Sequence, residues 1–572
     1  MKLTDILAQI LIKKGIGHVF GLQGGAVVHI FDSLEKAGMG VTYMHHEQSA
    51  SLAAVAHSKI SEKLGCAVVT TGPGATNAIT GLLASWQDSI PCIFISGQVR
   101  SQHMSYGKKV RQVGTQEVNI CDIVRPITKY CETIINPNEF EEKLSKAIEI
   151  AKEGRPGPVW IDLPLEFQWE DLKYSHSFLD EAFRNSKLPK YDFKKYEEVE
   201  KSIKKSSKPL LILGYGVRLA GGKDLIKDFV ENAEIPFVTT WTACDLFTTN
   251  NKYNLGVIGM TGQRGANKAV FDADLLICLG THLSIPHTTT LYESYAPNAK
   301  KIIINIDGDQ LNNLNINFDL KIESDLLPFL KWIVDKKTEK QNLLNFESYK
   351  TLNWYEPKTK KNIDTNLFVH KLTERTSKKC VIIDGGGTAL YAGFQSIVIN
   401  KGDRVICSSA ISAMGTGLAE TIGISKSKDG NFEKFYCIIG DGSFLMNIQD
   451  LQTIKQENIN VVICVINNNG YLAIRNTQKD FLGGKYYGTH PDWRLQMPSI
   501  DKLAQGFQIA YEKIELNDSL SDSIDRIIKS DGPLICEVIV SEDQPVLFKQ
   551  EYKALPNGLF EPLPLSNMLR GD

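Results

Sequence analysis

Short apolar runs alternate with amphipathic stretches along nearly the whole chain. Nine runs are continuous, as buried strands are, and most of them end in Gly, Asp or Asn. They cover residues 66–71, 91–97, 158–164, 209–214, 274–280, 301–307, 380–387, 435–442 and 461–468. Helical patterns lie between these runs. Continuous strands that alternate with helices are typical of parallel sheets with helices on both faces, so we expect an α/β fold.

Two polar stretches, at about 170–195 and about 336–365, divide the pattern into three blocks. The length of 572 residues agrees, because roughly 150 residues make one domain. We predict three doubly wound parallel-sheet domains and an irregular C-terminal tail. The predicted bounds are 1–170, 190–338, 366–545 and 546–572.

Composition narrows the class of protein. Lys and Arg total 64 against 66 Asp and Glu, which leaves no electrostatic footprint for a nucleic acid. No apolar run approaches the ~18 residues that cross a membrane, and the apolar positions of residues 3–11 have the spacing of an amphipathic helix. The 11 cysteines form no CxxC pair, and several lie inside apolar runs, as Cys278, Cys437 and Cys464 do. Buried free thiols indicate a reducing compartment, so we expect a cytoplasmic, soluble protein.

The clearest chemical signal is the motif Gly440-Asp441-Gly442-Ser443. A second motif, Asn468-Asn469, follows it, with 25 residues between Gly442 and Asn468. The first group follows an apolar run and opens a predicted helix, SFLMNIQDLQTIK, so its glycines and free N–H groups can approach a phosphate. The next apolar run brings Asn469 to the same edge of the sheet. A carboxylate, an amide oxygen, a backbone carbonyl and phosphate oxygens suit Mg²⁺ better than Zn²⁺. A turn without any ligand is the alternative.

These segments, GDGSFLMNIQDLQT and NVVICVINNNGYL, resemble the diphosphate-binding signature of thiamine diphosphate (ThDP) enzymes, most closely the acetolactate synthase group. The resemblance implies a Mg²⁺ site made by Asp441, Asn469 and the carbonyl of Tyr471. It also implies two glycine-rich loops at the diphosphate and a Met that braces the thiazolium ring. The residues that it assigns to the cofactor in this half are Gly386, Gly387, Thr388, Met414, Gly415, Gly442, Ser443, Tyr471 and Leu472.

Residues 19–34 and 43–98 resemble the pyrimidine-binding domain of the same group. Glu47 aligns with the glutamate that acts on the aminopyrimidine, and the segment 111–130 is similar to one that carries a Gln facing the reaction centre, here Gln116. The resemblance assigns Gly24, Gly25, Pro73 and Asn77 to the cofactor-binding loops of this half. The alternative for Glu47 alone is an acidic residue in the first turn of a helix, which the helix dipole favours.

The chain departs from the group where the substrates would bind. Its candidates for substrate contact are Gln23, His29, Ile474, Arg475 and Gln478. Several of these, and Thr115, are more polar than the residues of the group, and a buried polar pocket implies a polar substrate. Arg475 could pair with a carboxylate or a phosphate, or be a surface cation. His29 could instead be a partly buried, hydrogen-bonded histidine.

The middle block resembles the central domain that holds a non-redox FAD in acetolactate synthases. The Arg-rich stretch that contacts FAD in that group is not reproduced, and residues 281–286 read THLSIP instead. A Gly-rich loop after a strand is weak support for a nucleotide by itself. FAD is therefore possible but doubtful, and a purely structural middle domain is at least as well supported.

The resemblance implies a ThDP- and Mg²⁺-dependent carboligase or lyase. Its donor would be a 2-oxo acid, pyruvate above all, and its acceptor a carbonyl compound more polar than usual, such as a keto sugar. Two alternatives remain: a ThDP-dependent hydrolase that opens a cyclic dione without releasing CO₂, and a non-catalytic binding protein. Retention of Glu47, Asp441 and Asn469 argues against the binding protein. The resemblance also implies a homodimer or homotetramer with active sites between subunits.

Overall fold

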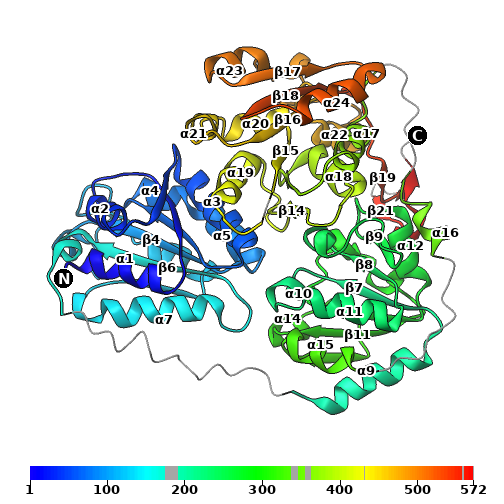
Figure 1. Ribbon diagram of the computed structural model, residues 1–572, viewed down its shortest axis with the longest axis horizontal. Coiled ribbons are helices and arrows are strands. Elements are labelled where there is room, and N and C mark those ends of the chain that lie inside the picture. The colour runs from blue at the N-terminus through cyan, green and yellow to red at the C-terminus, as the bar shows by residue number, and fades with distance from the viewer. Residues whose placement is uncertain (174–190, 337–345, 355–361, 431, 557–559, 571–572) are drawn as a thin grey trace.

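The computed structural model contains three six-stranded sheets, each with helices packed against it (Figure 1). It describes residues 1–173, 191–336, 346–354, 362–430, 432–556 and 560–570. All strand pairs within the three large sheets are parallel, which confirms the predicted α/β class and the three doubly wound sheets. Each of the nine predicted runs forms a strand. The two polar stretches predicted as linkers lie in large part outside the described residues.

The N-terminal sheet has the strand order β2-β1-β3-β4-β6-β5. Its strands are β1 (His18–Gly21), β2 (Gly40–Tyr43), β3 (Gly65–Val69), β4 (Cys92–Gln98), β5 (Tyr130–Thr133) and β6 (Pro158–Pro164). The helices around it are α1 (Leu3–Lys13), α2 (Val28–Lys36), α3 (Glu47–Ser61), α4 (Pro73–Asn77), α5 (Ile79–Gln87), α6 (Ile120–Val124) and α7 (Phe140–Lys152). Helix α1 is the predicted N-terminal amphipathic helix.

The middle sheet has the order β12-β11-β10-β7-β8-β9. Its strands are β7 (Pro209–Leu213), β8 (Phe237–Thr239), β9 (Asn254–Val257), β10 (Leu275–Leu279), β11 (Lys300–Asn305) and β12 (Leu320–Glu323). Its helices are α9 (Phe193–Lys205), α10 (Gly216–Leu219), α11 (Lys223–Ala233), α12 (Arg264–Asp272), α13 (Ile285–Thr288), α14 (Gly308–Asn312), α15 (Leu326–Val334) and α16 (Glu347–Lys350).

The C-terminal sheet has the order β14-β13-β15-β16-β18-β17. Its strands are β13 (Lys379–Ile383), β14 (Arg404–Ile406), β15 (Lys434–Gly440), β16 (Val461–Asn467), β17 (Ala510–Ile514) and β18 (Leu534–Ile539). Its helices are α17 (Thr365–Glu374), α18 (Gly387–Ser396), α19 (Thr416–Ser425), α20 (Asp441–Met446), α21 (Asp450–Gln456), α22 (Leu472–Leu482), α23 (Ile500–Gly506) and α24 (Leu520–Ile528).

Short 3₁₀ turns complete the connections, and the tail is more regular than predicted. The 3₁₀ turns are η1 (Ser101–His103), η2 (Arg125–Ile127), η3 (Pro137–Glu139), η4 (Leu165–Trp169), η5 (Trp241–Leu246), η6 (Tyr292–Ser294), η7 (Pro491–Trp493), η8 (Asn517–Ser519) and η9 (Leu565–Asn567). Where we expected irregular chain, β19 (Phe548–Lys549) pairs with β22 (Leu569–Arg570), and β20 (Tyr552–Ala554) pairs with β21 (Phe560–Pro562). Both pairs are antiparallel: a short connection joins β20 to β21, and the longer segment 550–568, which contains that pair, joins β19 to β22.

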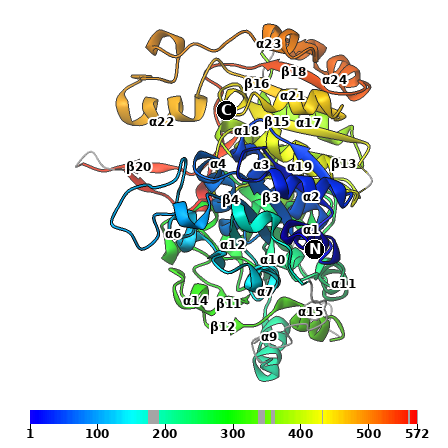
Figure 2. The same ribbon diagram turned by 90° about the vertical axis from the view of Figure 1, so that its left-hand side faces the viewer.

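Apolar side chains are buried on both faces of each large sheet, which is why the central strands read as continuous apolar runs. In the N-terminal sheet, Phe20 and Phe94 belong to one buried cluster and Val19 and Ile93 to another. The first of these clusters continues into the C-terminal domain through α3 and α19. Figure 2 shows α3 and α19 next to each other between the two sheets. The two domains therefore share one core.

Glycine makes the α3–α19 crossing possible. A Cβ built on Gly423 of α19 would lie 2.1 Å from the carbonyl oxygen of Ala53 in α3, closer than real Cβ atoms approach. One helical turn further along α3, His57 Nδ1 lies 3.2 Å from the carbonyl oxygen of Gly423. The close backbone approach holds α3, which begins at Glu47, rigidly against the C-terminal domain.

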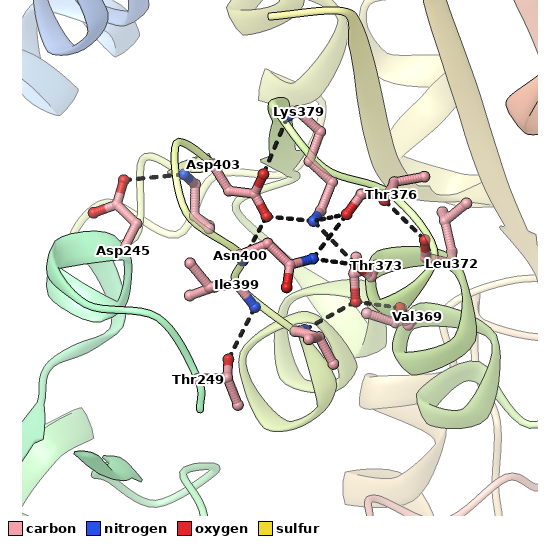
Figure 3. A network of polar contacts seen from close by, with 12 residues as sticks. Asp245, Thr249, Val369, Leu372, Thr373, Thr376, Lys379, Ile399, Asn400 and Asp403 are labelled. Carbon is pink, nitrogen blue, oxygen red and sulfur yellow. Dashed lines mark hydrogen bonds and ion pairs between the residues drawn. The ribbon is translucent and has the colours of Figure 1, made fainter. Parts of the chain in front are cut away.

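Polar side chains join the middle domain to the C-terminal domain at the other end of the C-terminal sheet. Thr249 Oγ1 accepts a hydrogen bond of 2.9 Å from the backbone of Ile399, and Asp245 accepts one of 3.1 Å from the backbone of Val405. Within the C-terminal domain, the buried ammonium of Lys379 pairs with Asp403 (Figure 3). It also donates to the carbonyls of Thr373 and Thr376, at the end of α17 and just after it. The hydrogen bonds of Thr249 and Asp245 join the middle domain to the edge strand β14 and to the segment before it.

All eleven cysteines lie in the described residues, are buried and are free, as predicted for buried thiols. Among the described residues, no helix combines the length and the apolar character that a membrane crossing requires.

Candidate functional site

The predicted cofactor residues lie beyond the carboxyl ends of strands, in two of the three domains. In these sheets the strand order reverses between β1 and β3 in the N-terminal sheet and between β13 and β15 in the C-terminal sheet. Such switch points are where open α/β sheets bind ligands, because the following loops turn in opposite directions. Gly24 and Pro73 flank the first switch point, and Gly386 and Gly442 flank the second.

Glu47 is the first residue of α3 and is buried, with 8% of the residue exposed. The preceding residue, His46, caps the helix through an acceptor Nδ1 that lies 3.1 Å from the backbone nitrogen of Gln48. Asn77, at the end of α4, donates a hydrogen bond of 3.0 Å to Glu47 Oε2. The other oxygen, Oε1, faces Gly74, where an added Cβ would be 3.3 Å away. The glycine leaves room beside the carboxyl group that a larger residue would fill.

The loops around Glu47 pack directly on one another. A Cβ on Gly24 would lie 2.5 Å from Thr70 Cβ, and one on Gly72 would lie 2.2 Å from the carbonyl oxygen of Gln116. Gly72 and Gln116 both have left-handed φ angles, of 63° and 60°. The structure therefore brings Gly24, Asn77, Glu47 and Gln116 together. Gly25, Pro73 and Gln116 are exposed on this surface.

Two candidates for substrate contact on this half lie apart from Glu47. The ring of His29 packs against Trp169 at 5.0 Å between ring centroids, and burial together with the nearby Lys2 lowers the pKa of His29. Among the described residues, no hydrogen bond or ring contact joins His29 to another predicted site residue. Its place agrees better with a partly buried histidine than with a substrate contact. Gln23 is exposed and lies beside the hydroxyl of Tyr43.

On the C-terminal domain, Gly386 and Gly387 lead from β13 into α18. A Cβ on Gly386 would lie 2.5 Å from Met414 Cγ, whereas Gly387, with φ of 73°, has open space where a Cβ would be. Thr388 Oγ1 faces Asn468 Nδ2 at 3.5 Å. Gly415, also left-handed with φ of 83°, follows Met414 and begins the α19 turn. The first loop, Met414 and Gly415 therefore meet at one place, with Met414 partly exposed.

Asp441 follows β15 and begins α20, with its side chain 1% exposed. Its oxygens accept hydrogen bonds of 2.9 Å from the backbone of Gly442 and 2.8 Å from the backbone of Gly470. Burial raises the pKa of Asp441 to about 6 against these hydrogen bonds. The helix predicted after this motif is in fact two helices, α20 and α21. They are separated at Asn447, whose side chain donates 2.8 Å to the carbonyl of Gly415.

Asn469 and Tyr471 reach the same edge from β16. Asn469 has φ of 60°, and its side-chain amide donates a hydrogen bond of 2.8 Å to Glu542. This fixes the amide nitrogen at Glu542 and leaves the amide oxygen for another partner. The ring of Tyr471 lies against Gly442, where an added Cβ would be 2.2 Å from the ring. Ser443 is buried next to Gly442, and Leu472 is the first residue of α22.

The donor atoms in this region fit a cation bound to a diphosphate. A carboxylate, an amide oxygen and a backbone carbonyl are hard oxygen ligands, which Mg²⁺ prefers. Two further buried oxygens, Asn468 Oδ1 and Asp384 Oδ2, have no hydrogen-bond partner within the described residues. Burial raises the pKa of Asp384 to about 7, so this carboxyl group can carry a proton and donate to an anion. The residues present therefore fit ThDP and Mg²⁺.

Arg475 and Gln478 are placed otherwise than expected. Arg475 is 4% exposed and donates to four backbone carbonyls, those of Asn468, Asn469, Thr489 and Glu542. It is therefore neither a surface cation nor free to pair with a substrate anion. The buried Gln478 is bonded to the hydroxyl of Thr489 and the carbonyl of Tyr487. Ile474 is 51% exposed, on the outer face of α22.

The sequence analysis missed three residues of this site: Asp384, Asn468 as a side chain in its own right, and Glu542. The end of a predicted strand just before the GGG loop could have indicated Asp384. Glu542 lies 73 residues after Asn469, and only the parallel pairing of β16 with β18 brings it near, so no local pattern could have indicated it.

Within one chain, each half of the site makes its own hydrogen bonds, although Ser49 of α3 donates 3.4 Å to Asn447 just after α20. The hydrogen bonds of Glu47, Asn77 and Gln116 all stay in the N-terminal domain. Those of Asp441, Asn469 and Tyr471 all stay in the C-terminal domain. Among the described residues, no hydrogen bond joins one of these sets to the other.

Comparisons with known proteins agree with this division. Residues 1–123, 196–333 and 385–538 match, in that order, the N-terminal TPP binding domain, the central domain and the C-terminal TPP binding domain of thiamine pyrophosphate enzymes. The chain is 30% identical to the acetolactate synthase large subunit of Cyanidium caldarium, over 94% of this chain and 93% of that protein. It is 31% identical to the acetolactate synthase large subunit of Buchnera aphidicola subsp. Acyrthosiphon pisum, over 93% of each. It is 28% identical to the acetolactate synthase isozyme 2 large subunit of Escherichia coli K12, over 92% of this chain and 94% of that one.

Proposed function

The chain belongs to the acetolactate synthase-like family of thiamine diphosphate-dependent enzymes, and from this we propose that it decarboxylates a 2-oxo acid, with pyruvate as the first candidate, and joins the remaining acyl fragment to a carbonyl acceptor. One observation carries the proposal. The buried carboxyl group of Glu47, closely approached by Gly74, and an oxygen-donor set around Asp441 occupy the switch-point ends of the two sheets that match TPP binding domains.

Glu47 would act on the aminopyrimidine ring. When bound, ThDP supplies an acidic carbon that adds to a 2-oxo acid and then accepts the negative charge left by the loss of CO₂. Glu47 holds a proton for the ring at Oε1, the oxygen that faces Gly74, while Asn77 holds Oε2 at 3.0 Å and fixes the plane of the carboxyl group. A carboxyl group that is buried and fixed loses little energy to reorientation when the proton moves.

Asp441, the amide oxygen of Asn469 and the carbonyl of Tyr471 would hold Mg²⁺. Gly386, Gly387, Thr388, Gly442 and Ser443 would approach the diphosphate, and Met414 would support the ring between the two loops. The support is the convergence of these residues on one sheet edge and the unpaired oxygens of Asn468 and Asp384 beside them. Glu542 contributes by orienting the Asn469 amide.

The acceptor would be a polar carbonyl compound such as a keto sugar. Exposed Gln116 and the neighbouring Thr115 lie on the loop beside Gly72 and support a polar acceptor surface near Glu47. Arg475 and Gln478 do not contribute to it, because backbone carbonyls and Thr489 already satisfy their polar atoms.

Two copies of the chain would complete each active site. The support is that the hydrogen bonds of each half stay within its own domain, so that neither half depends on the other for its conformation. The domain division 1–170, 190–338 and 366–545 remains our proposal for the functional units, with the tail 546–572 as an appendage of the C-terminal unit.

The middle domain would act without FAD. At its switch point the loops after β7 and β10 close on each other: Gly216 donates 3.0 Å to the carbonyl of Gly280, and a Cβ on Gly214 would lie 2.2 Å from that oxygen. The carboxylate of Asp307, after β11, is already paired with Arg155 at 3.0 Å. These residues do not fit a dinucleotide. The visible absorption spectrum of the purified protein tests this, because bound flavin would absorb there.

The proposed reaction is tested by supplying pyruvate, ThDP and Mg²⁺ with and without a keto sugar, and identifying the products by mass spectrometry. We expect CO₂ and a product that contains the acyl fragment joined to the sugar. Joining to a second pyruvate would contradict the polar acceptor. Cleavage of a cyclic dione without CO₂ release would contradict the decarboxylation.

The metal site has its own test in Asp441→Asn, which keeps the shape of the side chain but removes its charge. We expect the affinity for ThDP in the presence of Mg²⁺ to fall by at least about tenfold. Asp450→Asn is the matched control, because Asp450 is also a buried aspartate of this region but does not lie at the strand end. Equal affinities for the two variants would contradict the assignment of Asp441.

A further inference from the structure

A long loop connects β4 to α6 in the N-terminal domain. It runs from Val99 to Asn119, and its only regular element is the single 3₁₀ turn η1. Loops of this length without secondary structure are uncommon in compact domains and are usually functional. The loop carries Gln116, the residue expected to face the reaction centre, in a left-handed conformation with φ of 60°. Something must therefore hold this loop in one conformation.

The side chain of Gln98 closes both ends of the loop. Gln98 is the last residue of β4 and is fully buried. Its Oε1 accepts a hydrogen bond of 3.0 Å from the backbone nitrogen of Val99, and its Nε2 donates one of 2.7 Å to the carbonyl of Val118. A backbone nitrogen can only donate and a carbonyl can only accept, so these two partners fix the orientation of the amide.

Asp162 holds Gln98 in this orientation. It lies on the neighbouring strand β6, and it is fully buried. Its Oδ2 accepts 3.0 Å from Gln98 Nε2 and 3.2 Å from Thr133 Oγ1, and its Oδ1 accepts 2.6 Å from Ser96 Oγ. Burial raises the pKa of Asp162 to about 6 against these three hydrogen bonds, so the carboxylate is charged at neutral pH and accepts from all of them.

The same network reaches Gln116. The hydroxyl of Thr71, just after β3, lies 2.9 Å from Gln98 Oε1 and 3.4 Å from the carbonyl oxygen of Gln116. Gly72, the next residue, leaves the space that this carbonyl occupies. The carboxylate of Glu117 binds backbone nitrogens within the loop, at 2.8 Å for Val113 and 3.1 Å for Gly114. Asp162 thus orients Gln98, and Thr71 lies between Gln98 and the backbone of Gln116, with one hydroxyl proton that it donates to Gln98 Oε1 at 2.9 Å or to the Gln116 carbonyl at 3.4 Å.

We propose that Gln98, oriented by Asp162, is a positioning residue that sets the place of Gln116 and thereby decides whether the acyl fragment is joined to a carbonyl acceptor or is protonated by water. The inference rests on the proposed function. After CO₂ leaves, the electron pair on the fragment forms either a C–C bond to the acceptor, whose oxygen then takes a proton, or a C–H bond with a proton from water, which yields the aldehyde. A loop held in place favours the first outcome, because it orients the acceptor and excludes water.

The test supplies Gln98→Leu with pyruvate and the keto sugar. It measures the ratio of the carboligation product to acetaldehyde. We expect the ratio to fall on the order of tenfold while the affinity for ThDP stays unchanged, since misplacement of a positioned group costs rate rather than cofactor binding. Ser85→Ala is the matched control: it removes a buried hydrogen bond of the same domain, from Ser85 Oγ to the carbonyl of Ile90, and leaves Asp162, Gln98 and the loop untouched. It should not change the ratio.

Combining Gln98→Leu with Gln116→Ala separates positioning from general loosening. If Gln98 acts through Gln116, the double variant has the ratio of Gln116→Ala alone. Thr71→Val, which removes the hydroxyl between Gln98 and Gln116, provides the same test with a smaller change in the core, and we expect it to lower the ratio as well.

An unchanged ratio in Gln98→Leu and Thr71→Val, or independent effects of Gln98 and Gln116, would overturn the inference. CO₂ release by the unaltered enzyme is measured first, because its absence would contradict the proposed function itself.

Discussion

Single residues in this chain often do something other than their type suggests. Arg475 occupies a position where a cation could meet a substrate anion, but its guanidinium is used to bind the chain to itself. Four carbonyls from three segments converge on it, and two of them belong to the Asn468-Asn469 turn that carries the metal-site amide. Its role is therefore to hold the turn between β16 and α22.

Replacing Arg475 tests this role. Arg475→Met keeps the apolar stem but removes a donor from four carbonyls, of which that of Thr489 keeps a hydrogen bond from the backbone of Tyr471. We expect a loss of about 2–4 kcal/mol in the free energy of unfolding, measured by urea denaturation, and a weaker affinity for Mg²⁺ and ThDP. The KM for the acceptor should change little. If the variant were as stable as the parent and only the KM for an anionic acceptor rose, Arg475 would face the substrate instead.

At the scale of elements, the sequence predicted strands that are buried on both faces and read as continuous apolar runs. β16 and β10 are continuous apolar runs because helices cover both sides of them, and the sequence analysis placed both. Short or partly exposed strands were not found: β17 has only one buried residue among five, and β14 is three residues long. Neither carries the continuous apolar run on which the predictions depended.

The break between α20 and α21 shows why an element can differ from its pattern. The apolar positions of residues 443–456 continue with helical spacing across the break. The helix ends at Met446 because Asn447 turns to bind the carbonyl of Gly415 in another loop. A tertiary hydrogen bond outweighs local propensity here, and no local pattern contains that information.

Helix α21 gives a prediction on pH. Asp450, its first residue, is fully buried, and neither carboxylate oxygen has a hydrogen-bond partner within the described residues. Burial raises the pKa of Asp450 to about 7 in the folded state, from its usual value of 3.8. The folded chain therefore keeps a proton that the unfolded chain loses, and this carboxyl group lowers stability as pH rises from about 4 to about 7.

Asp450→Asn removes that effect. We expect the variant and the parent to be nearly equally stable at about pH 4, and the variant to gain an advantage of up to about 4 kcal/mol as the pH approaches 8. Urea denaturation of the cofactor-free protein across this range measures the difference. An advantage that shrank as the pH rose would show that Asp450 is stabilised as a carboxylate.

At the scale of the whole molecule, buried charges tie the three domains together. Asp245 of the middle domain accepts 2.7 Å from Arg218 of its own domain and 2.8 Å from Arg404 of β14. Arg404 also donates 3.1 Å to the carbonyl of Lys59 in α3. The positive field of both arginines keeps the pKa of Asp245 below its usual value although burial opposes this. One carboxylate thus links all three domains.

Loss of this carboxylate should be costly. Asp245→Ala would leave the buried guanidinium of Arg404 without an anion and Arg218 with only Glu62, at 3.4 Å, and we expect a loss of about 3–5 kcal/mol in unfolding free energy. Asp32→Ala is a control, because Asp32 forms exposed pairs with Lys2 and Lys36 and should change stability by at most about 1 kcal/mol. Equal effects of the two substitutions would contradict a special role for the buried carboxylate.

The candidate site could be predicted from the sequence to the extent that motifs bring residues together. Gly440–Ser443 and Asn469 follow adjacent strands, and Glu47 begins a helix next to a glycine loop, so the two halves could be recognised. Two features could not be predicted: the hydrogen bond from Gln98 to the carbonyl of Val118, and the burial of Arg475 among backbone carbonyls. Both depend on contacts between segments whose spacing in the sequence follows no pattern. That the hydrogen bonds of each half stay within its own domain could also be seen only in the folded structure.

The most direct test of the central claim is CO₂ release from pyruvate by the unaltered enzyme and by Glu47→Gln, with ThDP binding measured on both. Gln keeps the size of Glu47 but cannot supply an acidic proton. We predict CO₂ release that depends on ThDP and Mg²⁺, and a loss of at least about a hundredfold in Glu47→Gln with the cofactor still bound. Equal rates of CO₂ release by the two proteins would contradict the account.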